Sequence, residues 1–313
     1  MKGIELSQKF YDSFGKPMLY EQFGDLLPFL AVGLIGSGSE CFGYDDDISQ
    51  DHDFEPGFCI FLPSEDVVDR RAAFLLERAY AKLPKEFMGF KRSVLSPVGG
   101  NRHGVLRTDD FLAEKIGTFG TLLSDMQWLS VPEQSLAEVT NGVIFFDNRG
   151  DLTAARNALS YFPEDIRKKK LASHLLIMAQ SGQYNYVRCL RHHEPAAAQL
   201  ALYEFVNSAL SVIFLLNKTY KPYYKWVFRA MRSLPYLSEQ ADMLEKLITT
   251  DNKEPLCEKK YNTVEKISSD IIEMLDKQEL TKAICADLEK HAYSVNDGIL
   301  NSEIRNLHIL AAL

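Results

Sequence analysis

Residues 33–62 read GLIGSGSECFGYDDDISQDHDFEPGFCIFL, and this stretch carries the clearest information about the fold. The apolar run at 30–36 is typical of a buried strand or of a helix end that enters a tight turn. The run at 58–62 is a second compact strand, bounded by proline and glycine. The turn after the first strand is formed by small residues, namely Gly36, Ser37, Gly38 and Ser39. Small residues allow backbone amides to approach a phosphate closely, so the turn is a candidate phosphate site.

Asp51 and Asp53 lie one residue apart, just before the second predicted strand. In an extended segment both carboxylates point to one face and His52 points to the other. Their Cα atoms would then be about 6.6 Å apart. This spacing suits a shared pair of divalent ions about 3.5–4 Å apart, as in-line phosphoryl transfer requires. Oxygen ligands favour magnesium, with Mn²⁺ as the alternative.

The aspartate-rich segment also has simpler explanations. Aspartates gather in solvated loops, and a short glycine-serine motif alone has a high false-positive rate. A calcium loop is a further alternative, but the aspartates do not follow its alternate-residue pattern with a closing glutamate. The combination of apolar run, Gly-Ser, Asp-x-Asp and apolar strand is more specific than any one part.

This combination resembles the motif of the polymerase-beta-type nucleotidyltransferases. The resemblance rests on GLIGSGSECFGYDDDISQDHDF, on WLSVPEQSLAEVTNGVIFFDNRGDLTAAR from Trp128, and on NKTYKPYYKW from Asn217. The wider pattern is similar to a poorly characterised two-domain branch with a helical C-terminal domain. Two departures stand out: the motif usually has an apolar residue where His52 stands, and Glu55-Pro56-Gly57 interrupts the strand.

The resemblance implies roles for particular residues. Gly36, Ser37, Gly38 and Ser39 would hold the β- and γ-phosphates of an NTP, ATP being the expected co-substrate, and Asp51 and Asp53 would bind two Mg²⁺ ions. The family's third carboxylate serves as metal ligand and general base, and its candidates here are Asp109, within the segment HGVLRTDDF from His103, and Asp147. A lysine of the helical domain would contact the triphosphate, and its candidates are Lys221 and Lys225.

The organisation of the chain favours an α+β fold. Strand and helix patterns alternate in residues 1–150, with a further strand at 142–147 and an amphipathic helix at 67–83 whose cap is expected at Ser64 and Glu65. We therefore expect a nucleotidyltransferase-type mixed sheet with flanking helices as the catalytic domain. Helical periodicity dominates residues 151–313, which predicts an all-helical bundle that closes the acceptor and nucleotide cleft.

Composition restricts the class of protein further. A formal charge of −8 over 313 residues argues against broad nucleic-acid binding, so DNA is not an expected partner. Residues 202–216 are apolar but are expected to form a buried bundle helix. His174 lies in a separate apolar helical run and is expected to be a hydrogen-bonded core residue. Scattered cysteines and the lack of a visible secretory signal predict a cytoplasmic protein with no membrane partner.

The predicted function is metal-dependent transfer of an NMP from an NTP to a hydroxyl acceptor. A small hydroxylated acceptor, such as an aminoglycoside-like sugar, is the leading expectation. The alternatives are a tRNA or protein acceptor, and a non-catalytic nucleotide-binding regulatory protein.

Overall fold

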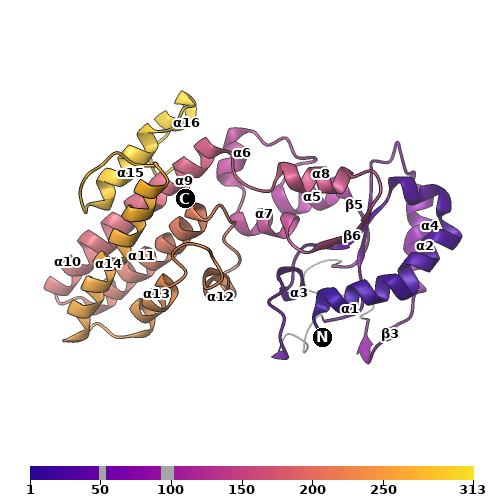
Figure 1. Cartoon of the computed structure of the whole chain (residues 1–313), viewed down its shortest axis with the longest axis horizontal. Helices are drawn as coiled ribbons and strands as arrows, with labels where there is room; N and C mark the ends of the chain where they lie inside the picture. The colour runs from indigo at the N-terminus through magenta and orange to yellow at the C-terminus, as the bar shows by residue number, and fades with distance from the viewer. Residues whose placement is uncertain (49–53, 93–101) are drawn as a thin grey trace. The chain divides into compact units, whose positions relative to one another are not determined.

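The computed structural model describes residues 1–48, 54–92 and 102–313. The chain forms two compact units, and Figure 1 shows the elements of each. The sheet unit comprises Met1–Leu123 and Ser135–Ser160, and the helical unit comprises Ser124–Gln134 and Tyr161–Leu313. The mixed α and β class and the helical C-terminal region are thus confirmed. The sequence places a boundary at residue 150, whereas the contacts place the helix that follows residue 150 with the sheet.

The sheet unit is built on four strands: β1 (Ala31–Leu34), β2 (Cys59–Leu62), β5 (Gly104–Arg107) and β6 (Val143–Asp147). Their order is β5-β2-β1-β6. Strand β1 runs antiparallel to both of its neighbours, while β2 and β5 are parallel. The sheet is therefore mixed, and the three strands predicted around residues 30–36, 58–62 and 142–147 are confirmed. A separate hairpin pairs β3 (Glu86–Phe87) with β4 (Phe90–Lys91).

The helical segments of the sheet unit lie before, between and after these strands. They are α1 (Gly3–Phe10), the π-helix η1 (Tyr11–Gly15), α2 (Lys16–Gln22), the 3-10 helix η2 (Gly24–Phe29), α3 (Ser39–Phe42), α4 (Arg70–Ala81), α5 (Thr108–Ile116), α7 (Glu133–Thr140) and α8 (Asp151–Ala158).

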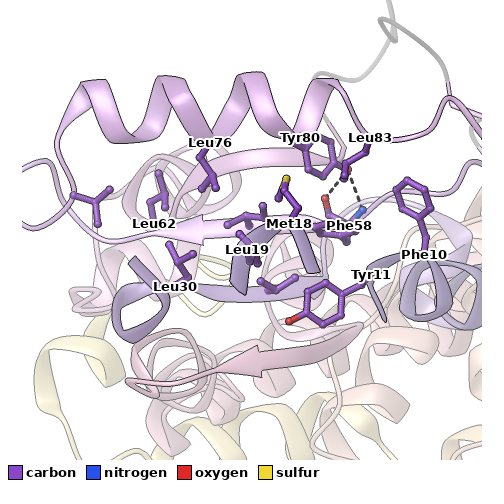
Figure 2. Close-up of a cluster of buried hydrophobic side chains, with 13 residues drawn as sticks. Phe10, Tyr11, Met18, Leu19, Leu30, Phe58, Leu62, Leu76, Tyr80 and Leu83 are labelled. Carbon is purple, nitrogen blue, oxygen red and sulfur yellow. Dashed lines mark hydrogen bonds between the residues drawn. The ribbon is translucent and has the colours of Figure 1, made fainter. Parts of the chain in front are cut away.

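Alternate residues of β2 pack against different helices, because successive side chains of a strand point to opposite faces. On one face, Ile60 and Leu62 join a cluster with Leu19 of α2 and Leu76 of α4 (Figure 2). On the other, the ring of Phe61 packs edge-on against Phe111 of α5, 5.3 Å between centroids. The sheet is thus covered by helices on both faces.

The start of α4 differs from the prediction. The helix begins at Arg70, and the Asp69 carboxylate accepts a hydrogen bond from the Ala72 amide at 2.7 Å. Ser64 and Glu65 are therefore not its cap. Asp69 is also a helix-capping residue and lies closer to the first turn of the helix. Its carboxylate satisfies the Ala72 amide, which would otherwise lack a partner.

The helical unit is organised around α9 (Glu164–Met178) and α11 (Pro195–Leu216), which pack against each other. Buried Arg167 of α9 donates to Leu215 O at 2.9 Å, Glu164 Oε1 at 2.7 Å and Gln278 Oε1 at 2.6 Å. It thereby satisfies a carbonyl at the end of α11, where helical partners are lacking. The remaining segments are α6 (Asp125–Ser130), the π-helix η4 (Ala179–Asn185), α10 (Tyr186–Arg191), α12 (Val227–Met231), α13 (Gln240–Thr249), α14 (Leu256–Lys277), α15 (Leu288–Asp297) and α16 (Ser302–Asn306).

Helix α11 is long and apolar enough to cross a membrane by length and composition, and it alone is so among the described residues. However, 67% of its most apolar window is buried inside the protein. That burial is typical of the core helix of a soluble protein and confirms the predicted buried bundle helix.

Candidate functional site

The turn that follows β1 is held by a side chain from the loop before β6. Asn141 Oδ1 accepts from the Gly36 amide at 2.9 Å, and Asn141 Nδ2 donates to the Gly36 carbonyl at 2.7 Å. Gly36 and Gly38 have φ values of +121° and +122°. Only glycine adopts such values readily, so the backbone here requires the residues that the sequence provides.

Ser37 lies in a compact group with Lys115 of α5 and Glu138 of α7. Its hydroxyl donates to Glu138 Oε2 at 2.7 Å and accepts from Lys115 Nζ at 2.8 Å. Lys115 and Glu138 also form an ion pair at 2.9 Å. A hydroxyl held on two sides keeps one orientation, and the lysine places a positive charge directly beside the turn.

Lys115, Arg102, Gly36 and Ser37 line a small pocket of about 70 Å³. Asp110 and Glu114 also line this pocket, so its two basic side chains offer donors to an anion beside the turn but are offset by two acidic ones. The volume is too small for a whole nucleotide, so this pocket suits one phosphate group at most.

Glu40, at the start of α3, faces Gly38. A Cβ at Gly38 would lie 2.3 Å from Glu40 Oε1, so the glycine leaves room for this carboxylate. Glu40 is 7% exposed, and its Oε1 has no hydrogen-bond partner among the described residues, although Arg102 Nη1 lies 3.9 Å away. Burial raises the pKa of Glu40, since the charged form loses its water. A carboxylate oxygen that accepts no hydrogen bond from the described residues is a hard donor, which fits a divalent ion such as Mg²⁺.

Asp51 and Asp53, the predicted metal ligands, lie outside the described residues. The described chain that follows them enters β2 at a defined end of the sheet. Cys59 pairs with Gly33 in antiparallel register, so residues 54–58 approach β2 from the end where β1 runs into its turn. Glu55 and His103 also meet at this end, with His103 Nδ1 3.2 Å from Glu55 Oε1.

Asp109 and Asp147 lie at the opposite end of the sheet. Asp147 pairs with Ala31, the first residue of β1, and Asp109 follows Arg107, the last residue of β5. Both line a cavity of about 470 Å³ that does not include the Gly36–Ser39 turn. The Asp147 carboxylate accepts from the Gly150 amide and from both the amide and hydroxyl of Thr153. The structure therefore brings the two aspartates together but separates them from the turn.

The two predicted nucleotide lysines of the helical unit have different surroundings. Lys221 Nζ donates to Ser211 Oγ at 2.6 Å and to Asn207 Oδ1 at 3.3 Å, inside a cavity formed by the helical unit itself. Lys225 is exposed. Contact with a triphosphate remains a prediction for both.

Sequence reasoning missed the residues that support the turn. Lys115 and Glu138 are 78 and 101 residues from Ser37, and Asn141 is 105 residues from Gly36. Only the packing of α5 and α7 beside the turn brings them there. Glu40 could have been identified, because it directly follows the glycine-serine run.

Among the described residues, no group of three or more His, Cys, Asp or Glu side chains is arranged to hold a metal ion. A site that includes Asp51 or Asp53 extends beyond those residues. To such a metal site the described residues could contribute the side-chain oxygen atoms of Glu40 and Ser37 as ligands.

Comparison with known proteins gives limited information on function. No curated protein matches the chain. Residues 128–227 match a family described as a domain of unknown function (DUF4037), which covers less than half of the chain and does not include the Gly36–Ser39 turn.

Proposed function

We propose that this protein is a metal-dependent nucleotidyltransferase that moves an NMP from an NTP to a hydroxyl acceptor. The observation that carries the proposal is the turn after β1. Asn141 fixes its backbone, Lys115 and Glu138 fix the Ser37 hydroxyl, and the described residues from Phe54 onward enter the neighbouring strand at the same end. Phosphoryl transfer requires the phosphates and the metal-binding carboxylates to lie next to each other, and this end of the sheet would hold both.

In this proposal the turn binds the phosphates, and Lys115 balances part of their charge. Asp51 and Asp53 hold the divalent ions, which in phosphoryl transfer stabilise the attacking and leaving oxygens. Glu40 replaces Asp109 and Asp147 as the candidate for the third carboxylate, because it faces Gly38 whereas the two aspartates lie at the far end of the sheet.

The first test is magnesium-dependent binding of an ATP analogue whose α,β-bridging oxygen is replaced by methylene, measured by calorimetry. Asp51→Asn and Asp53→Asn should each weaken metal-dependent binding by about tenfold or more, which is 1.4 kcal/mol or more. Asp47→Asn is the matched control, since this exposed aspartate belongs to the same acidic run but not to the Asp-x-Asp pair. Equal binding by Asp51→Asn and wild type, or binding without metal, would refute the proposal.

The second test is turnover. Pyrophosphate release from ATP and magnesium should require an added hydroxyl acceptor and should be lost in Asp51→Asn. Separate incubations with aminoglycoside-like sugars, total tRNA and protein substrates, followed by mass spectrometry, distinguish the acceptor classes. Binding of the nucleotide with no nucleotidylated product in any incubation would instead identify a regulatory nucleotide-binding protein.

A further inference from the structure

The helical unit contains a cavity of about 840 Å³ that the proposed chemistry does not use. Its walls come from α9, α11, the segment 129–134, the residues around α12, Ile248 and the C-terminal residues 312 and 313, all within this unit. The volume lies in the range of sites that hold small organic molecules. Its polar side chains are gathered from several elements: Glu133, Lys170, His174, Asn207, Ser211 and Lys221.

Two lysines of this cavity, buried Lys170 and half-buried Lys221, form fewer hydrogen bonds with the described residues than an ammonium can donate. Lys170 is 6% exposed, and its ammonium donates to one acceptor, Leu129 O, at 3.3 Å. Its other near neighbour is the face of the Phe162 ring, 5.1 Å away. Lys221 donates to two neutral acceptors, Ser211 and Asn207. A lysine ammonium has three donors, so both lysines retain donors that the described residues leave unused.

Other buried lysines of the same unit provide a contrast. Lys169 donates to Asn296 Oδ1, Arg305 O and Leu307 O, and Lys260 donates to Gln199 Oε1, Thr250 O and Asn252 Oδ1. Each of these has an acceptor for every donor, as expected of a structural lysine. Lys170 and Lys221 differ in this respect, and they are the two that line the cavity.

The charges around the cavity favour a negative ligand. Among the described residues, neither Lys170 nor Lys221 forms a salt bridge with a carboxylate. One acidic side chain, Glu133, lines the cavity, and its Oε2 accepts from the backbone amide of Lys221 at 3.1 Å. Burial lowers the pKa of both lysines, because the ammonium ions have lost water, and the charge of Glu133 offsets this effect only in part. An anion placed between them would supply the missing acceptors and charge.

His174 adds a third polar group with an unused atom. Its Nδ1 is buried and has no hydrogen-bond partner within the described parts of the chain, so the prediction of a hydrogen-bonded core histidine is wrong for this atom. Burial, together with the nearby lysines, lowers its pKa to about 3. The imidazole is therefore neutral at pH 7 and can accept or donate one hydrogen bond to a ligand.

The remaining wall is apolar and aromatic. Tyr203, Tyr223 and Tyr224 line the cavity together with Leu210 and Val206. Tyr223 and Tyr224 hold their ring centroids 4.3 Å apart, and Tyr224 is 70% exposed. Exposed aromatic rings beside a cavity offer flat apolar surface to a ligand body.

We propose that this cavity binds a small organic anion, with its carboxylate or phosphate group at Lys170 and Lys221 and its apolar body against the tyrosines. The site lies within the helical unit and does not depend on the nucleotidyltransferase proposal. It would allow the protein to select a small molecule by its charge and by its apolar part together.

The test uses three probes of similar shape: 3-phenylpropionate, phenyl phosphate and the neutral 3-phenylpropionamide. Ligand-detected NMR and calorimetry on the full chain measure their binding. At least one anion should bind, and the amide should not. The anion that binds more tightly identifies whether the headgroup is a carboxylate or a phosphate.

Three variants connect the binding to the cavity. Lys170→Met and Lys221→Met should each weaken anion binding by about tenfold or more, whereas Lys246→Met, at an exposed site, should not change it. Methionine keeps the length of the side chain and suits a buried site, so the variants are expected to fold. Lys221→Arg, which keeps the charge, should retain most of the binding.

The proposal is overturned by any of three results: neither anion binds, the amide binds as well as the anions, or both methionine variants bind like wild type. Ser37→Ala, in the sheet unit, separates this site from the nucleotide site. Anion binding that survives Ser37→Ala but not Lys221→Met supports the cavity. Loss in Ser37→Ala alone would place the binding at the turn and would contradict the inference.

Discussion

Tyr80 shows how one hydroxyl can stabilise a strand from a neighbouring helix. Its oxygen accepts from the Phe58 amide at 3.1 Å and donates to the Phe58 carbonyl at 2.9 Å, just before β2 (Figure 2). Phe58 is fully buried, so no water can replace the hydroxyl. The same burial raises the pKa of Tyr80, which keeps the hydroxyl protonated and able to donate.

Tyr80→Phe should therefore lower the free energy of opening at β2 by about 1–3 kcal/mol, because it leaves the buried Phe58 amide unpaired, whereas the Phe58 carbonyl still accepts from the Gly104 amide at 3.0 Å. Hydrogen exchange of peptides that cover β2, read by mass spectrometry, measures this change. Tyr20→Phe is the control, since Tyr20 is 52% exposed in the same unit. Similar exchange in both variants would show that the Tyr80 hydroxyl contributes nothing to β2.

The residues of the candidate site differ in how far the sequence could identify them. Gly36 and Ser37 were predictable, because the need for small residues after an apolar strand is a local property. Lys115 and Glu138 were not, since no local pattern connects them to Ser37 across 78 and 101 residues. Glu40 was adjacent to the motif, but its burial and its unpaired oxygen depend on packing that the sequence does not display.

At the scale of elements, Asp147 illustrates how a carboxylate can join a strand to the next helix. It ends β6 and accepts from the amides of Gly150 and Thr153 at 2.9 and 2.8 Å, and from the Thr153 hydroxyl at 2.7 Å. These groups stand at the start of α8, where amides lack helical partners. Asp147 therefore has a structural role, because its carboxylate accepts hydrogen bonds at the start of α8.

Asp147→Ala should destabilise the junction of β6 and α8 by about 0.5–2 kcal/mol, the usual cost of losing a helix-capping side chain. Faster hydrogen exchange in the first turn of α8 would show this loss. Asp109→Ala removes an exposed aspartate for which no such bonds are present among the described residues, and it should leave exchange unchanged. A fall in stability that is equal in both variants would contradict the capping role.

Among the elements, strands and buried helices were predictable where the pattern of apolar residues is local. The three predicted strands formed because each apolar run is bounded by glycine, proline or turn residues. Sheet order was not predictable, since β5 pairs in parallel with β2 although about 40 residues separate them in the chain. The start of α4 was misplaced because several residues of similar capping chemistry, from Ser64 to Asp69, precede it.

At the scale of the whole molecule, the two units can be observed separately. The chain has two tryptophans, and both Trp128 and Trp226 belong to the helical unit. Intrinsic tryptophan fluorescence therefore reports on the helical unit, whereas far-UV circular dichroism reports on both. An unfolding experiment should record both signals, because a two-unit chain need not unfold in a single step.

This property allows a pH test of buried His174. Its folded pKa of about 3 lies below the ordinary value of 6.5, so the unfolded chain binds more protons between these values. The stabilising contribution is present above pH 6.5 and is lost as the pH falls towards 3, with a slope of at most about 1.4 kcal/mol per pH unit. Lys221 and Lys170 act in the same direction as burial, because they would repel a charged imidazole.

His174→Gln should remove this dependence, since glutamine does not titrate. In urea unfolding followed by tryptophan fluorescence, wild type should lose stability relative to the variant as the pH falls from 6.5, and the two curves should run parallel above it. His192→Gln, at an exposed position of the same unit, controls for the loss of one histidine. Parallel curves throughout the acid range would mean that the folded chain gains the proton at His174 at the same pH as the unfolded chain, and that His174 is not held neutral in the fold.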